Sequence, residues 1–123
     1  MKKLMYLPIV MGMLLNLSCE SEEVEISSNL SGTWNGSYSG DDRGVWVVTV
    51  DNNGNVNGTA TSSFTNDSSP ISGTVSDNGA LSATLGNTTD REFVGQLKEN
   101  NEAIGTWIDS GRDFEGTWEG TKQ

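Results

Sequence analysis

Histidine is absent from this 123-residue chain, and cysteine occurs once, at Cys19. Outside that position the chain therefore lacks the commonest general base, the cysteine nucleophile and the usual zinc ligands. A single thiol also excludes an internal disulfide. An enzyme built from this sequence would have to rely on carboxylates. We predict no enzymatic activity, no metal site and no cofactor.

Basic residues are scarce as well, with seven Lys and Arg against seventeen Asp and Glu, which gives a net charge of -10. Lys2 and Lys3 stand in an N-terminal segment that we expect to be removed, so the mature chain would carry about -12. This charge disfavours nucleic acid as a partner and also disfavours binding to anionic lipid through a basic patch. Only two prolines occur, and no segment beyond residue 18 has a helical period.

The one long apolar run spans residues 4–17 and lies between the two lysines and Ser18-Cys19. Charged, apolar and small residues in that order are typical of an export signal. The run is too short for a comfortable transmembrane helix, although a single permanent span remains the alternative. Residues 15–19, with the sequence LNLSC, resemble the bacterial lipobox, in which the cysteine is diacylated and becomes the new N-terminus. The resemblance implies a signal peptide over residues 1–18 and a lipidated Cys19.

An acidic stretch follows the cysteine, with four glutamates between residues 20 and 25. Its apolar content is too low for a packed core, so residues 19–29 are predicted to be a solvated tether. Acidic residues directly after a lipidated cysteine resemble the surface-export signal of Bacteroidota lipoproteins. That resemblance implies a lipid anchor in the outer membrane with display on the cell surface. A tether facing the periplasm is the alternative, and in both cases the folded domain is predicted to span residues 30–123.

A five-residue pattern recurs six times in that domain: an apolar residue, a polar residue, glycine, Thr or Gln, and a small or apolar residue, with minor departures. The units are residues 30–34, 56–60, 71–75, 93–97, 103–107 and 114–118. Because side chains alternate between the two faces of a strand, positions one, three and five share one face. The sequence predicts strands over residues 30–38, 44–51, 55–64, 70–76, 80–85, 91–98, 102–108 and 113–121.

Turn chemistry gives a separate prediction of how these strands pair. Residues 51–54 and 76–79 suit three-residue hairpin loops closed by a left-handed glycine, and Asn101 can take that role in residues 98–101. These turns would pair Val50 with Val56, Val75 with Leu81, and Leu97 with Ala103. Apolar residues lie opposite apolar residues in each case, which agrees with the repeat.

The two observations together predict an inward face without charged residues. Its members are Leu30, Trp34, Tyr38, Trp46, Val48, Val50, Val56, Phe64, Ile71, Val75, Leu81, Leu85, Phe93, Leu97, Trp107, Phe114 and Trp118. In the second strand, Val45 and Val47 would face outward. Inward glycines would let the strands coil and give room to indoles from neighbouring strands.

Eight short strands in a meander predict an all-β, eight-stranded antiparallel up-and-down barrel, because pairing the last strand with the first removes both edges. A β-sandwich is the alternative. A transmembrane barrel would need the opposite facing of apolar residues, and several of these strands are shorter than a membrane requires.

The first predicted strand, residues 30–37 (LSGTWNGS), resembles the opening of the calycins, the family of lipocalins and avidins, whose Gly-x-Trp closes one end of a barrel. The resemblance implies a central ligand site, with Asn35 and Ser37 as the nearest matches to polar ligand contacts of avidins. Gly-x-Trp recurs at residues 105–107 and 116–118.

The tryptophans of the inward face have two interpretations. Trp34, Trp107 and Trp118 either fill the core or form the floor of a site for a small apolar or sugar-like ligand, with Tyr38, Ser62 or Ser37 at its rim. A barrel axis packed solidly with indoles would argue against a ligand site. The leading hypothesis is a non-enzymatic, lipid-anchored, calycin-like barrel that binds a small ligand at the cell envelope.

Two further hypotheses stay open. One is a protein-interaction or inhibitor lipoprotein that acts through loops at residues 39–44, 64–70 and 86–91. The other is a carboxylate hydrolase, for which the nearest pairs would be Asp41 with Asp42, Asp109 with Asp113, and Glu115 with Glu119. We expect these carboxylates to lie in turns or on the outer face, where they keep a β protein soluble.

Overall fold

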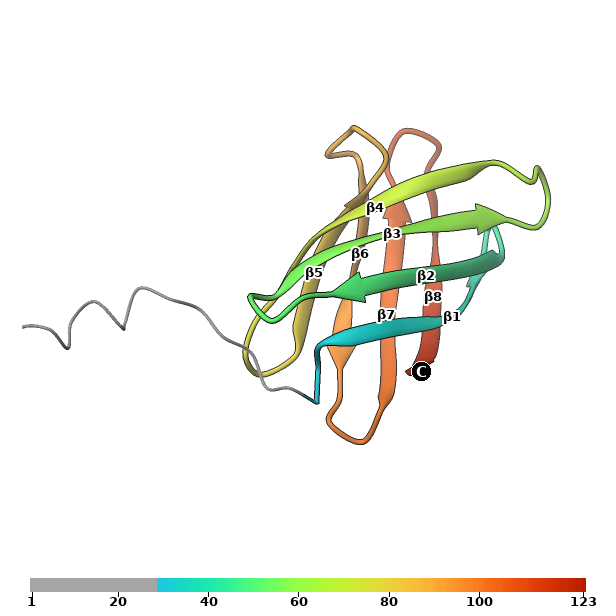
Figure 1. Ribbon diagram of the computed structural model, residues 1–123. Coiled ribbons are helices and arrows are strands. Elements are labelled where there is room, and N and C mark those ends of the chain that lie inside the picture. The colour runs from blue at the N-terminus through green and yellow to red at the C-terminus, as the bar shows by residue number, and fades with distance from the viewer. Residues whose placement is uncertain (1–28) are drawn as a thin grey trace, which may run out of the picture.

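The computed structural model describes residues 29–123, so the predicted signal peptide, Cys19 and most of the predicted tether lie outside the described residues. Eight antiparallel strands form a closed barrel in which each strand pairs with its neighbours in sequence and β8 pairs with β1 (Figure 1). The strands are β1 (Gly32–Gly40), β2 (Gly44–Val50), β3 (Asn55–Ser62), β4 (Ser68–Val75), β5 (Ala80–Leu85), β6 (Arg91–Leu97), β7 (Glu102–Asp109) and β8 (Phe114–Lys122). The predicted up-and-down barrel is confirmed, and the sandwich alternative is wrong.

The three predicted hairpin turns have the expected geometry. Val50 pairs with Val56, Val75 with Leu81, and Leu97 with Ala103. The residues that close these turns have positive φ: Gly54 at 85°, Gly79 at 90° and Asn101 at 74°. Asn101 thus occupies the left-handed conformation that glycine takes in the other two turns, which is accessible to asparagine at low cost.

The predicted facing is confirmed along almost the whole sheet. Trp34, Trp46 and Phe93 are fully buried, whereas Val45 and Val47 on the outer face of β2 are exposed. Tyr38 and Phe114 are partly buried and pack against the core. This facing, with apolar residues toward the barrel axis and polar residues outside, is the reverse of that of a transmembrane barrel. Within residues 29–123 the structure has no helix of the length and apolar character needed to cross a membrane.

Phe64 is the exception to the predicted inward face, because it is 64% exposed. The strand that was expected to run to residue 64 ends at Ser62, whose backbone N–H donates to Asp67 O and whose carbonyl accepts from Asn66 N–H. The chain therefore turns before Phe64 reaches the inward register. The ring lies instead beneath the Arg43 guanidinium, with 5.5 Å between Cζ and the ring centroid.

Glycines on the inward face provide the space that the indoles fill, as predicted. Gly95, Gly105 and Trp118 are successive partners across β6, β7 and β8. A Cβ built on Gly105 would lie 2.2 Å from Cζ2 of Trp118, and one built on Gly95 would lie 2.5 Å from the same atom. The Trp46 indole uses Gly120 in the same way. Each indole therefore fills the space that a side chain on a neighbouring strand would occupy if the glycine there were replaced.

Three aromatic rings fill the middle of the barrel. Phe93 and Trp118 are stacked, with centroids 4.5 Å apart and an interplanar angle of 8°. Trp46 meets both rings edge-on, at 5.5 Å from Phe93 and 5.2 Å from Trp118. All four indole N–H groups donate to backbone carbonyls, so burial of these polar groups is compensated.

The two ends of the barrel differ. One, which we call the sealed end, carries the turns at residues 51–54, 76–79 and 98–101. Leu30, 1% exposed, lies here before β1 and accepts a 2.8 Å hydrogen bond from Nε1 of Trp34. The opposite end, which we call the open end, carries the loops at residues 41–43, 63–67, 86–90 and 110–113. Strand β1 begins at the sealed end, so the N-terminal end of the described chain lies there (Figure 1).

Candidate ligand-binding cavity

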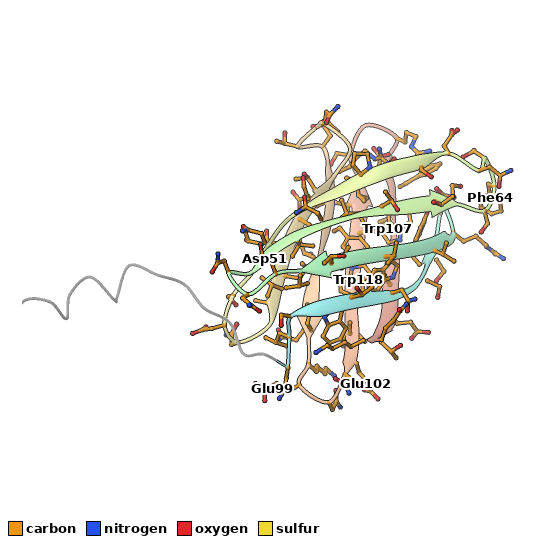
Figure 2. The ribbon with its side chains drawn as sticks, in the orientation of Figure 1. Asp51, Phe64, Glu99, Glu102, Trp107 and Trp118 are labelled. Carbon is orange, nitrogen blue, oxygen red and sulfur yellow. The ribbon has the colours of Figure 1, made fainter. Side chains whose placement is uncertain are left out.

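A cavity of about 230 Å³ lies at the open end of the barrel. A polar cavity of this size has room for several ordered water molecules or for a small ligand. Its lining residues are Tyr38, Asp42, Ala60, Ser62, Thr65, Asp67, Ser69, Leu85, Arg91, Phe93, Trp107, Asp109 and Arg112. Figure 2 labels Trp107 in the interior and Phe64 at the tip of the open-end loop between β3 and β4.

The floor of the cavity is apolar and aromatic. Trp107, Phe93, Leu85 and Ala60 are buried residues of four different strands, and all four line the cavity. Trp107 meets Tyr38 edge-on with centroids 5.7 Å apart, and its Nε1–H donates to Ser39 O at 3.1 Å. Because that N–H is already used, Trp107 offers a ligand a ring surface and no hydrogen bond.

One wall of the cavity carries a buried carboxylate between two arginines. Asp109 of β7 is 5% exposed, and its Oδ2 accepts a 2.8 Å hydrogen bond from Nε of Arg112. Oδ2 also lies 3.3 Å from Nε of Arg91, which is the cross-strand partner of Asp109 on β6. The predictions of a charge-free inward face and of an Asp109 in a turn or on the outer face are therefore wrong. Strand β7 extends one residue past its predicted end, and the alternation turns that residue inward.

The arginines set the ionisation state of this carboxylate. Burial alone would raise the pKa of Asp109, but the hydrogen bonds and charge of Arg112, with the charge of Arg91, bring its pKa below the usual value. Asp109 is therefore ionised at neutral pH and acts as a hydrogen-bond acceptor. Asp113, with which Asp109 was paired in the carboxylate-hydrolase alternative, is exposed at the neighbouring loop. Because Asp109 is ionised and bonded to Arg112, it can position the two guanidinium groups but has no proton to donate at neutral pH.

Hydroxyl and carboxylate groups form the opposite wall. Ser62 of β3 donates a 2.9 Å hydrogen bond to Oδ1 of Asp42 in the loop between β1 and β2, and it accepts one from Phe64 N–H at 3.1 Å. Burial raises the pKa of the nearby Tyr38 hydroxyl, and the charge of Asp42 adds to that increase. Tyr38 therefore stays protonated at neutral pH. Strands β3 and β7 are four strands apart in the eight-stranded barrel, so Ser62 and Asp109 lie on opposite sides of the open end.

The structure separates the residues predicted to bind ligand. Tyr38, Trp107 and the buried Ser62 line the cavity. Trp34 lies fully buried near the sealed end, and Trp118 belongs to the central aromatic cluster. Asn35 and Ser37 alternate with Trp34 and Tyr38 and point to the outer face of β1. The central site that the calycin resemblance implied is occupied by rings, and the space for a ligand lies at the open end.

Sequence reasoning missed Arg91, Asp109 and Arg112 as cavity residues. The signal for two of them was present, because Arg91 stands two residues before the inward Phe93 and Asp109 two residues after the inward Trp107. Side chains two apart on a strand share a face. Arg112 carried no such signal, since its position depends on the path of a loop.

The remaining carboxylates of interest lie elsewhere. Asp51 accepts hydrogen bonds from the backbone N–H groups of Asn53 and Asn55 and from the Asn55 side chain, which closes the turn at the sealed end. These bonds lower the pKa of Asp51, with the backbone bond from Asn55 as the largest cause. Glu115 and Glu119 are exposed. In residues 29–123, no three His, Cys, Asp or Glu side chains are grouped as metal ligands.

Comparison with known proteins gives no relative from which a role could be transferred: no protein-family model, no curated sequence and no solved structure matches this chain significantly.

Proposed function

We propose that this protein is a non-enzymatic, lipid-anchored envelope lipoprotein with a calycin-like barrel that binds a small ligand at its open end. The observation that carries the proposal is the cavity itself. The rest of the barrel axis is filled with side chains, whereas this end keeps about 230 Å³ of space above an aromatic floor. Ligand sites in proteins combine such an apolar lining with a few convergent polar groups.

The position of the cavity fits a tethered protein. The described chain, which follows the predicted lipidated Cys19 in sequence, begins at the sealed end, and the cavity lies at the opposite end. An anchor at Cys19 in the outer membrane, on the cell surface or facing the periplasm, would therefore leave the cavity accessible to the solvent. The substitution Cys19→Ser tests the anchor, because it removes the thiol that would carry the lipid. The protein is then expected to move from the membrane fraction to the soluble fraction of the cell.

Ligand binding is tested by NMR on the soluble barrel, residues 19–123 with Cys19→Ser, with the tryptophan indole N–H groups as reporters. A mixture of amino acids, sugars, carboxylates and small aromatic compounds is added to the protein. Binding at the open end should shift the indole signal of Trp107, which lines the cavity. The signal of Trp34 near the sealed end is the internal control and should stay in place.

A variant with a filled cavity completes the test. Ala60→Phe places a ring in the cavity from β3 and should abolish the shifts at Trp107. Thr59→Phe places the same ring on the opposite face of the same strand, next to Ala60, and should leave them unchanged. The proposal fails if no compound of any class perturbs Trp107, or if Ala60→Phe folds and binds as well as the unsubstituted barrel.

One observation favours a second function, protein interaction through the open-end loops. Phe64 exposes 64% of its surface at the tip of the loop between β3 and β4, beside Arg43. Exposed aromatic residues and arginine are enriched at interaction sites. A partner captured by the barrel and lost with Phe64→Ser, while binding in the cavity is unaffected, would support this alternative.

A further inference from the structure

We infer that the ligand of the open-end cavity is a small dipolar carboxylate, a molecule with a carboxylate at one end and ammonium or hydroxyl donors at the other. The inference rests on the proposed function and specifies its ligand. The carboxylate would lie against Arg91 and Arg112, and the donor end against Asp42. The inference depends on the groups that line the cavity. Two arginines, Arg91 and Arg112, lie beside Asp109. The carboxylate of Asp42 and the hydroxyls of Ser62 and Tyr38 also line the cavity.

The arginine wall has hydrogen-bond donors to spare. A guanidinium carries five N–H donors. Arg112 uses Nε for Asp109, and no acceptor within residues 29–123 takes a hydrogen bond from its Nη atoms. Arg91 donates from Nη1 to Ser69 Oγ at 3.3 Å, and its Nε is buried without a hydrogen bond although it lies 3.3 Å from Oδ2 of Asp109. Two positive charges thus share one negative charge, which leaves this wall with one net positive charge and free N–H groups that suit a planar carboxylate.

The opposite wall has acceptors to spare. Oδ1 of Asp42 accepts from the hydroxyl of Ser62 and from the backbone N–H of Arg43, but a carboxylate has about four acceptor positions. Asp67 at the rim adds a second negative charge. A ligand with only negative charge would be repelled here, whereas an ammonium or hydroxyl group would gain a charge-assisted hydrogen bond.

The distribution of basic residues over the molecule is consistent with a local anion site. All three arginines of the chain, Arg43, Arg91 and Arg112, lie at the open end, and the two lysines of residues 29–123, Lys98 and Lys122, lie at the sealed end. The whole chain is strongly acidic, so its long-range field repels anions. Binding of a carboxylate therefore depends on direct contact with the guanidiniums, and the second, positive or neutral end of the ligand offsets the repulsion.

The test compares probes that differ only in their ends. 4-Aminobutyrate, butyrate and butylamine are titrated against the soluble barrel, with the Trp107 indole shift and calorimetry as readouts. 4-Aminobutyrate should bind best and butylamine worst. D-Glucuronate and D-glucose form a second matched pair, in which the sugar acid should bind more tightly. Stronger binding of 4-aminobutyrate indicates an amino-acid type of ligand, and stronger binding of glucuronate indicates a sugar acid.

Two variants assign the ends of the ligand. Arg112→Gln removes one guanidinium at a half-exposed position and should weaken binding of every carboxylate probe by about tenfold or more. Asp42→Asn should leave the binding of butyrate unchanged or improve it while it removes the preference for 4-aminobutyrate. Lys98→Gln deletes a positive charge at the sealed end and is the matched control, expected to change affinity less than about twofold because the charge is distant and screened.

Failure of this inference is distinguishable from failure of the proposed function. If apolar or neutral probes shift Trp107 as strongly as the carboxylates do, or if Arg112→Gln binds all probes normally, the cavity is a ligand site but the dipolar carboxylate is wrong. Butylamine binding more tightly than butyrate would also overturn the inference. If no probe and no compound of the wider mixture shifts Trp107, both fail together.

Discussion

Glycine residues decide how the interior of this barrel is filled. Gly105 has on its inward side the ring of Trp118, and its neighbour across the ladder, Gly95, lies against the same ring. An alanine at either place would compete for volume with an indole that is itself fixed by hydrogen bonds to Val94 O and Thr106 O. The glycine of the five-residue pattern is therefore a packing residue here, and its conformational freedom is secondary.

We predict that Gly105→Ala destabilises the barrel by about 3 kcal/mol, at the upper end of the cost of overpacking. The added Cβ would stand 2.2 Å from both Cζ2 of Trp118 and the carbonyl oxygen of Val94, and the backbone oxygen has no room to move. Gly111→Ala is the matched control. Its Cβ meets only Oδ1 of Asp109, at 3.5 Å, so the change should stay within about 0.5 kcal/mol. Urea unfolding followed by tryptophan fluorescence measures both, and equal midpoints would contradict the packing described.

Asp109 gives the protein an acid-sensitive contribution to stability. Burial opposes its ionisation, but Arg112 and Arg91 lower its pKa in the folded state below the value of about 3.9 expected when the chain is unfolded. Because the folded pKa is the lower one, the contribution is fully present above the unfolded pKa and is lost as pH falls through the folded pKa.

The difference in free energy of unfolding between the unsubstituted barrel and Asp109→Asn should therefore be largest at neutral pH and shrink below about pH 4. Asparagine keeps the shape of the side chain and cannot change charge with pH. Urea unfolding at a series of pH values measures the difference. If this difference in the free energy of unfolding stays constant or increases on acidification, Asp109 does not depend on the two arginines for its ionisation.

At the scale of strands and turns, most of the structure could be predicted because local chemistry and periodicity agree. The turn closed by Asn101 fixes the pairing of Leu97 with Ala103, and the alternation then fixes every facing in β6 and β7. Counting six residues outward from that pair also places Arg91 opposite Asp109. The buried ion pair was thus contained in the predicted register. It was missed because the charge of each residue, considered alone, favours the solvent.

The ends of strands were harder to predict, since they depend on hydrogen bonds made by the loops. Phe64 continues the apolar alternation of β3, but the loop of residues 63–67 closes on Ser62 through Asp67 and through Asn66, which has a φ of 63°. Asparagine and aspartate both adopt that conformation at low cost, so the sequence does not decide between Asn66 and Asp67. The same limit applies to Arg112, whose place in the cavity follows from the loop between β7 and β8 and from its contact with Phe114.

At the scale of the whole molecule, the unequal ends of the barrel separate the attachment of the chain from the cavity. Short turns and Leu30 fill one end, while longer loops leave space at the other. Periodicity predicts which residues face the axis but not how far each indole reaches along it. The sequence therefore left open whether the barrel is packed or hollow, and the three central rings together with the open-end cavity show that both descriptions apply, at different depths.

Closure of the barrel depends on the ladder between β1 and β8, and it can be tested with an engineered disulfide. Ser37 of β1 and Glu119 of β8 are cross-strand partners, and both are exposed. Directly opposed residues have Cβ atoms about 5 Å apart, within reach of a disulfide with modest adjustment, whereas diagonal residues are about 7–8 Å apart. In a Cys19→Ser background, Ser37→Cys with Glu119→Cys should form a disulfide on oxidation.

The bond would close a long loop and should stabilise the barrel by about 2–4 kcal/mol, measured as the shift in urea midpoint between oxidised and reduced protein. Ser37→Cys with Thr121→Cys is the matched control, because Thr121 is the partner of Asn35 and lies diagonal to Ser37. Mass spectrometry under non-reducing conditions distinguishes the two pairs by the loss of two hydrogens. Faster oxidation of the control pair would place β8 in a different register, and β1 and β8 would then close the barrel with other inward neighbours around Trp118.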